Sequence, residues 1–174
     1  QWAGQSGIRL RLGITTNGTL LTIQNCEMLK RHTIGVQLSL DGSKRGNDVH
    51  RQIMGGTQCG MAASGAFNMV QIKNYMHYFG NSRPNARMTL TIHNLKYLMD
   101  SIRELHEMGF KSFSVIPDSD CGSWTREYLS KYESELGRLF EYWVQNREIN
   151  ITTIHQTIDK FASKTIHRTP LPVA

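Results

Sequence analysis

The chain has 174 residues, with 20 Lys and Arg against 14 Asp and Glu, and a formal net charge of +6. Its mean hydropathy of −0.40 is ordinary for a globular protein, and no run approaches the ~18–20 apolar residues that span a bilayer. We therefore expect no membrane partner. The basic residues are scattered rather than striped with aromatics, which argues against a nucleic-acid partner. The first residues lack an initiator Met and a signal peptide, so we expect a truncated or excised chain.

The three cysteines, Cys26, Cys59 and Cys121, are widely spaced. Disulfide frameworks favour small secreted domains with an even number of cysteines, so we expect reduced thiols and a cytoplasmic protein. No pair forms a CxxC motif, and the histidines lack the spacing of a zinc site. The sequence therefore predicts no metal site within this chain.

Apolar periodicity predicts strands that alternate with helices. Strands are expected over residues 8–16, 34–40, 87–92 and 110–116. Helices are expected over residues 22–31, 67–79, 95–108 and from 123 or 125 to 145. Thr22 and Asn94 are placed to cap two of the helices, and Gly109 is placed to end one. Residues 149–154 are either a short further strand or the approach to a helix over 156–162.

Strands that are each followed by a helix indicate parallel βα units. A doubly wound sheet and a barrel both satisfy this pattern. In either fold the loops after the strands gather at one edge of the sheet, where ligands bind. Much of the polar and glycine content follows the strands, in residues 17–18, 39–51, 93–94 and 117–121. The sequence therefore predicts a site at that edge.

Several polar residues at these loops are candidates for the site. Ser39 could bind a polar ligand group and Asp41 could cap its own loop, although a plain Asp-Gly turn explains both residues. Arg51 could return to the edge and clamp a carboxylate, or be a solvated surface charge. Strand alternation allows only one of Thr16 and Asn17 to point into a barrel interior.

Asp118 and Asp120 follow the last of these strands, beside Cys121. Paired carboxylates can bind a cation or act in acid–base chemistry. A loop that enters a helix also uses Asp and Ser as caps, and both interpretations stay open. The glycines between residues 55 and 65 do not form a phosphate loop, because no Gly-Lys-Ser/Thr follows them.

Five blocks of the sequence occur in a characteristic order. They are Ile-Thr-Thr-Asn-Gly-Thr-Leu-Leu (14–21), Val-Gln-Leu-Ser-Leu-Asp-Gly (36–42), Asp48 with Arg51, Arg87 to Asn94, and Gly109-Phe110-Lys111 before a strand. Over about residues 8 to 146, their order and spacing resemble radical S-adenosylmethionine (AdoMet) enzymes. The resemblance is greatest to members with a cysteine-rich SPASM extension, such as anaerobic sulfatase maturases and ribosomal-peptide maturases.

The resemblance implies an α/β fold: a partial parallel (β/α)6 TIM-like barrel, of which about four βα units, the third to sixth, are present. Residues 1–146 would form the central and C-terminal part of the barrel. Residues 147–174 would form a linker or helix toward a missing C-terminal extension.

The resemblance also implies residues close to AdoMet, namely Ser39, Arg51, Leu90, Ile116, Ser119, Thr16 and Asn17. Ser39 and Arg51 match the pair that holds the methionyl and ribose portion of the cofactor. Leu90 and the loop after Ile116 match positions near the adenine. Thr16 and Asn17 would face the reaction chamber. No catalytic residue is assigned.

The implied activity is the generation of a 5′-deoxyadenosyl radical at a [4Fe–4S] cluster, which then modifies a peptide or protein side chain. The partners would be that substrate and an electron donor such as flavodoxin or ferredoxin. The family's CxxxCxxC and Gly-Gly-Glu-Pro motifs are absent from this sequence. The cluster ligands would therefore lie outside this chain, and the chain alone is expected to be inactive.

The sequence also departs from the family within the shared blocks. Asn47-Asp48 stands where the family has His-Asp, and the stretch around residues 55–64 is longer and more polar. Two other hypotheses stay open. One is an unrelated α/β enzyme, such as another barrel or a doubly wound hydrolase, with Asp118 and Asp120 in its site. The other is a degenerate, non-catalytic binding module.

Overall fold

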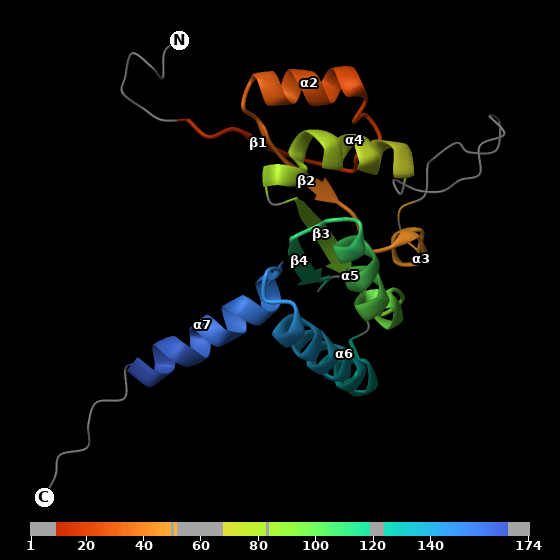
Figure 1. Ribbon diagram of the computed structural model, residues 1–174. Helices are drawn as coiled ribbons and strands as arrows, with labels where there is room; N and C mark the ends of the chain where they lie inside the picture. The colour runs from red at the N-terminus through yellow and green to blue at the C-terminus, as the bar shows by residue number, and fades with distance from the viewer. Residues whose placement is uncertain (1–9, 50, 52–67, 83, 119–123, 167–174) are drawn as a thin grey trace, which may run out of the picture.

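The computed structural model describes residues 10–49, 51, 68–82, 84–118 and 124–166, with side chains up to residue 160. A parallel five-stranded sheet forms its centre (Figure 1), and the strands are arranged in chain order. They are β1 (Gly13–Thr16), β2 (Gly35–Ser39), β3 (Asn85–Leu90), β4 (Ser112–Pro117) and β5 (Asn150–Ile151). The sequence predicted four of these strands. For residues 149–154 it left open a short strand or the approach to a helix, and the structure has the short strand β5 followed directly by a helix that begins at Thr152.

Helices connect the strands and cover the sheet. They are α2 (Ile23–Arg31), α3 (Lys44–Asn47), α4 (Met69–Phe79), α5 (Leu98–Glu107), α6 (Arg126–Gln145) and α7 (Thr152–Ile166). Two short 3-10 turns, η1 (Gly80–Ser82) and η2 (Leu95–Tyr97), precede β3 and α5. No helix in the described part of the chain is long and apolar enough to cross a bilayer.

The strand order decides between the two fold types that the sequence left open. Parallel strands are joined by right-handed crossovers, so a strand order that follows the chain places successive helices on the same side of the sheet. A doubly wound sheet requires the order to reverse, and here it does not. Figure 1 shows α2, α4, α5 and α6 following one another around one side of the sheet. The arrangement is that of part of a barrel.

The helix ends mostly follow the predicted signals. Thr22 caps α2, where its hydroxyl accepts a hydrogen bond from the Asn25 amide. Of the two alternatives for α6, Thr125 is the cap. Gly109 follows α5 with φ +99°, a left-handed conformation that glycine adopts without strain.

The prediction that Asn94 caps a helix was wrong. Its side chain makes no cap bond; its Oδ1 accepts from the Thr91 amide at 2.7 Å, and its Nδ2 donates to the Thr89 carbonyl at 2.9 Å. This turn ends β3 at Leu90, two residues before the predicted end of the strand. The helix α5 then begins only at Leu98, after η2.

One face of the sheet packs against the helices. Its side chains are almost fully buried and include Leu38, Met88, Leu90, Phe113 and Val115. They contact a helical layer that contains Tyr75, Ile102 and Leu105, each at most 1% exposed. Complete burial of a large apolar side chain contributes about 1.5–3 kcal/mol, so this layer is the main source of stability.

Candidate functional site

The other face of the sheet, here called the open face, carries a different set of side chains. Because side chains alternate along a strand, the neighbours of each buried residue point to the opposite side. The register pairs Ser39 with Arg87 and Arg87 with Ser114 in one row across β2, β3 and β4. A second row pairs Asn85 with Ser112. The open face is therefore largely polar, whereas the helix-covered face is apolar.

Ser39 and Arg51 meet at the carboxyl edge of the sheet, as the sequence suggested for one site. The Arg51 Nη2 donates to Ser39 Oγ at 2.7 Å. The same guanidinium binds Asp41 twice, from Nε to Oδ2 at 2.6 Å and from Nη2 to Oδ1 at 3.0 Å. This two-pronged geometry is the one in which arginine and carboxylate bind most strongly. Asp41 therefore compensates the charge of Arg51.

The sequence allowed Asp41 to cap the loop that follows; among the described residues its carboxylate holds that loop through the Arg51 side chain and accepts none of the loop's backbone amides. Its side chain is 4% exposed, and its Oδ1 also accepts a hydrogen bond from the Thr89 amide of β3 at 2.8 Å. Asn47 stabilises the loop instead, because its Oδ1 accepts from the Asp41 amide at 3.1 Å. The departure from the family's His-Asp thus has a local structural role, with Asn47 fully buried.

Gly42 lets the chain leave the sheet immediately after Asp41. Its φ of +126° is a conformation that side chains rarely adopt, and a Cβ there would lie 2.3 Å from Ser101 Oγ. The loop from Asp41 to Asn47 is therefore packed tightly onto α5. This packing fixes the position from which the Arg51 side chain extends to the sheet.

Of the remaining sequence-predicted residues, those that the structure describes make no bond to Ser39 or Arg51. Leu90 lies on the helix-covered face and is 2% exposed. Ile116 lies on the open face, paired in register with Thr89, and is 44% exposed. Ser119 falls outside the described residues, as do Asp120 and Cys121.

At the end of β1, the structure favours a residue that the sequence analysis did not select. Thr16 is paired with the buried Leu38 and so lies toward the helices, where its hydroxyl accepts from the Gly18 amide at 3.2 Å. Asn17 is exposed and its Oδ1 binds Thr19. Thr15, by contrast, is on the open face and donates to Gln37 Oε1 at 3.1 Å. The register that pairs Thr16 with Leu38 is needed to identify Thr15, and alternation along one strand does not supply it.

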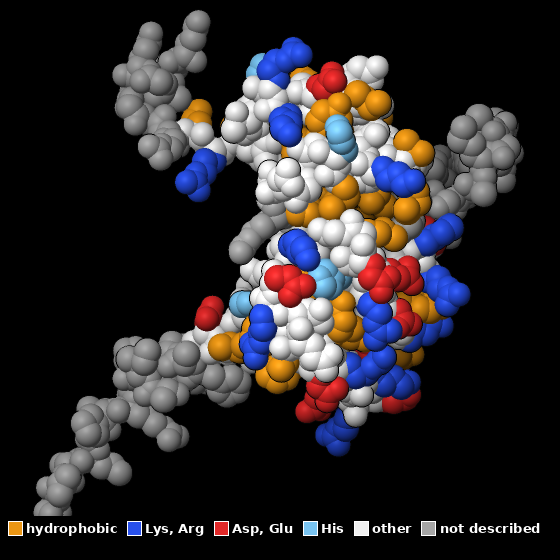
Figure 2. Space-filling view, viewed as in Figure 1, with side chains coloured by type: hydrophobic (Ala, Val, Ile, Leu, Met, Phe, Trp, Pro, Cys, Tyr) orange, Lys and Arg blue, Asp and Glu red, His pale blue; other side chains and the backbone are white. Residues whose placement is uncertain are grey.

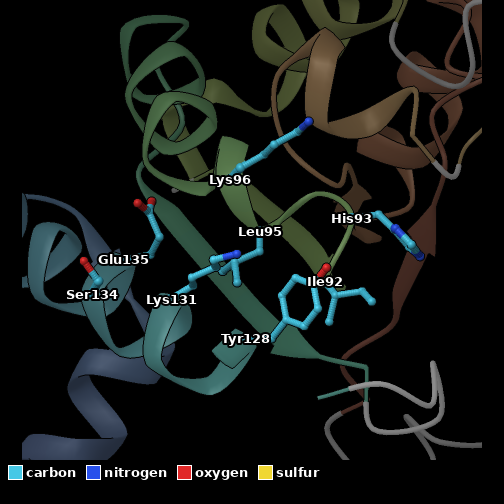
Figure 3. Close-up of a pocket in the computed structure, with 8 residues that line it drawn as sticks. All are labelled: Ile92, His93, Leu95, Lys96, Tyr128, Lys131, Ser134 and Glu135. Carbon is cyan, nitrogen blue, oxygen red and sulfur yellow. The ribbon is translucent and has the colours of Figure 1, made fainter. Parts of the chain in front are cut away.

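A separate cavity of about 500 Å³ lies beside the carboxyl edge, between the segment after β3 and α6 (Figure 3). Figure 3 shows Tyr128 and Lys131 of α6 opposite Ile92 and Leu95. None of the sequence-predicted residues lines it. Lys131 is paired with Glu127 at 2.6 Å, and Glu135 with Arg138 at 2.5 Å. Lys131 and Glu135 are therefore compensated, whereas Lys96, which also lines the cavity, lies over the Tyr97 ring at 4.9 Å.

Within the described residues, no group of three or more His, Cys, Asp or Glu could hold a metal ion. Cys26 is fully buried in α2, and burial raises the pKa of its thiol, which disfavours the thiolate that binds iron. The described residues therefore do not fit a [4Fe–4S] cluster.

Comparison with known proteins defines the fold. No family model matches the chain, and no curated protein matches its sequence. Solved structures match its shape: native anSMEcpe with bound AdoMet has a TM-score of 0.65 and 17% identity, over 86% of this chain and 42% of that chain. The same protein with bound AdoMet and Kp18Cys peptide has a TM-score of 0.64 and 18% identity, over 84% and 41% of the two chains.

The described chain thus has an α/β fold of parallel strands that alternate with helices and that matches part of these structures, which confirms the predicted fold class. It spans about two-fifths of the length of the solved structures that it matches. At 17–18% identity the likeness establishes only the arrangement of strands and helices. It does not assign the functions of the similar structures to this chain.

Proposed function

We propose that this chain is the AdoMet-binding part of a radical AdoMet enzyme that modifies a peptide or protein side chain. The observation that carries the proposal is the bond between Ser39 and Arg51 at the carboxyl edge. This edge is where parallel α/β folds bind ligands, and the fold is shared with structures that contain AdoMet.

The hydrogen-bond donors that Ser39 and Arg51 leave unused suit a polar ligand. Ser39 Oγ accepts from Arg51, which leaves its hydroxyl hydrogen to donate to a ligand oxygen. Arg51 uses Nε and Nη2, and among the described residues its Nη1 has no acceptor. The pair can therefore offer hydrogen bonds to a ribose hydroxyl or a methionyl carboxylate.

The charge of the site also suits AdoMet. The cofactor carries a sulfonium, an ammonium and a carboxylate, so it is a net cation. An uncompensated Arg51 would repel it, but the Asp41 carboxylate cancels the charge of Arg51 without removing all of its donors. Asp41 thus makes Arg51 a hydrogen-bond donor rather than a free positive charge.

When bound and reduced, AdoMet supplies hydrogen-atom abstraction. We propose that another part of the same protein holds the cluster and that flavodoxin or ferredoxin supplies the electron. The residues of this chain would orient the cofactor. We retain the sequence-based proposals for Leu90, Ile116 and Ser119 near the adenine, and for Thr16 and Asn17 at the substrate.

Calorimetric titration of the chain with AdoMet tests the cofactor proposal. Ser39→Ala and Arg51→Ala should each weaken binding about tenfold, which corresponds to the loss of one charge-assisted hydrogen bond. Ser134→Ala and Arg138→Ala on α6 are matched controls that should leave the affinity unchanged. Equal affinity in the wild type and Ser39→Ala would refute the proposed role of the edge.

A second assay tests the chemistry. The product of the whole gene is reconstituted anaerobically with iron and sulfide and supplied with a reduced flavodoxin or ferredoxin. Formation of 5′-deoxyadenosine supports the radical mechanism. A folded, iron-loaded protein that binds AdoMet without cleaving it would contradict the mechanism while leaving the binding site intact.

A further inference from the structure

Arg87 lies in the middle of the open face. It belongs to β3 between the buried residues Ala86 and Met88, and it is itself exposed. Its register partners are Ser39 on β2 and Ser114 on β4. Arg87 is therefore level with Ser39 and one strand away from it.

No acidic side chain in the described part of the chain compensates the charge of Arg87. Among the described residues its guanidinium donates no hydrogen bond and forms no ion pair, whereas Arg51 is bound by Asp41. Its open-face neighbours Gln37, Asn85 and Ser112 are neutral. Asn85 and Ser112 bind each other at 3.2 Å, and Gln37 accepts from Thr15. Arg87 is thus the only charged side chain placed on this face by the described strands.

Arg87 is exposed on the open face, so a ligand can reach its guanidinium directly. A ligand that covers Arg87 withdraws it from water, which costs several kcal/mol unless the ligand supplies an opposite charge and hydrogen bonds. A planar guanidinium matches a carboxylate with two parallel hydrogen bonds, which lysine cannot reproduce. The ligand group that best fits Arg87 is therefore a carboxylate or a similar planar anion.

AdoMet brings a single carboxylate, for which the Ser39 and Arg51 pair is the proposed site, and its net charge is positive. We infer that Arg87 binds a carboxylate of an acidic peptide substrate, presented to the open face next to Ser39. The identification of the peptide as a substrate rests on the proposed function. The preference for an anion rests only on Arg87 and its neutral surroundings.

Titration of the 15N-labelled chain with two peptides, followed by amide chemical shifts, tests the inference. The probes are acetyl-Glu-Ala-Glu-amide and its neutral analogue acetyl-Gln-Ala-Gln-amide. The chain should bind the acidic probe more tightly, and Arg87→Gln should weaken that binding about tenfold. Arg87→Lys keeps the positive charge but loses the paired donors of the planar guanidinium, and it should weaken binding of the acidic probe about threefold.

Arg103→Gln on α5 is the matched control, because it removes the same charge from an exposed helical position. It should change the affinity for the acidic probe less than about twofold, by screening alone. Equal weakening by Arg87→Gln and Arg103→Gln would overturn the inference and indicate non-specific attraction to a basic chain. Failure of the wild type to prefer the acidic probe would also overturn it, and would point to a carboxylate of the protein itself.

AdoMet affinity in Arg87→Gln separates the two proposals. An unchanged AdoMet affinity with lost peptide binding supports a substrate site. A loss of AdoMet binding as large as the loss of peptide binding would assign the anion to AdoMet and overturn the inference. A chain that binds the acidic probe through Arg87 but does not bind AdoMet would refute the proposed function alone.

Discussion

The two faces of the sheet have opposite chemistry. The helix-covered face is a continuous layer of buried apolar side chains, while the open face carries serines, amides and one arginine. Both faces are made by the same strands, so a single step along the chain moves a residue from one environment to the other. Figure 2 shows that acidic and basic side chains are interspersed over the helices α5 and α6. Stability therefore depends on the helix-covered face, while the ligand binding proposed above uses the open face.

The largest expected change in stability distinguishes two neighbouring residues of β4 that lie on opposite faces of the sheet. Phe113→Ala on the helix-covered side of β4 should destabilise the chain by about 4 kcal/mol, because it removes a fully buried ring and leaves a cavity. Its neighbour Ser114→Ala, on the open face, should cost less than about 1 kcal/mol. Urea unfolding measures both values, and similar losses would show that the open face is also part of the core.

The next effect concerns the polar edge. Asp41→Ala should cost about 3 kcal/mol, because it leaves Arg51 and the Thr89 amide without their buried acceptor. Asp48→Ala is the control: Asp48 pairs with the exposed Lys44, and this loss should be below about 1 kcal/mol. If the two variants unfold at the same urea concentration, Asp41 has no structural role.

Two glycines extend the comparison to the backbone. Gly42→Ala should destabilise by about 2 kcal/mol, since φ is +126° and the new methyl group would meet Ser101. Gly137→Ala, within α6 and with open space around it, should instead stabilise by about 0.5–1 kcal/mol through helix propensity. The sign of each change in melting temperature is the readout. A stabilising Gly42→Ala would mean that the loop does not hold this conformation in solution.

The smallest effect lies between the sheet and α4. Tyr75 Oη donates to the Val36 carbonyl at 3.1 Å and accepts from the Asn85 amide at 3.1 Å. Tyr75→Phe should therefore cost about 1 kcal/mol. Tyr78→Phe, which loses only an exposed bond to Glu27 at 3.2 Å, should cost a few tenths of that, about 0.3 kcal/mol. Equal stability of the two variants would show that the hydrogen bonds of Tyr75 to β2 and β3 do not stabilise the chain.

Most of the fold could be predicted from local sequence signals. Alternating strands and helices, the Thr22 cap and the Gly109 stop are all local patterns, and the structure confirms them. The end of β3 was missed because Asn94 can cap a helix or form a turn with equal ease. Its side-chain bonds to the Thr91 amide and the Thr89 carbonyl decide between these uses, and the residue types alone do not reveal these bonds.

The candidate site was harder to predict because its bonds join distant residues. The spacing of Ser39 and Arg51 gave no sign that Asp41 would take most of the hydrogen bonds of the arginine. Register, which fixes the row of Ser39, Arg87 and Ser114, cannot be read from a single strand. The buried residues Ala86 and Met88 nevertheless place Arg87 on the opposite face by simple alternation, so this signal was available.

Asp41 also sets how the edge can open. Beyond Ser39 the ladder between β2 and β3 continues through the Leu40 amide, which donates to the Arg87 carbonyl at 2.9 Å, and then through the Asp41 side chain. A carboxylate thus replaces one backbone rung, and the same carboxylate holds Arg51. Detaching Arg51 therefore loosens the last rung of the sheet, which makes the loop and the strand ends one cooperative unit in local unfolding. Slow hydrogen exchange at the Thr89 amide would report that this unit is closed.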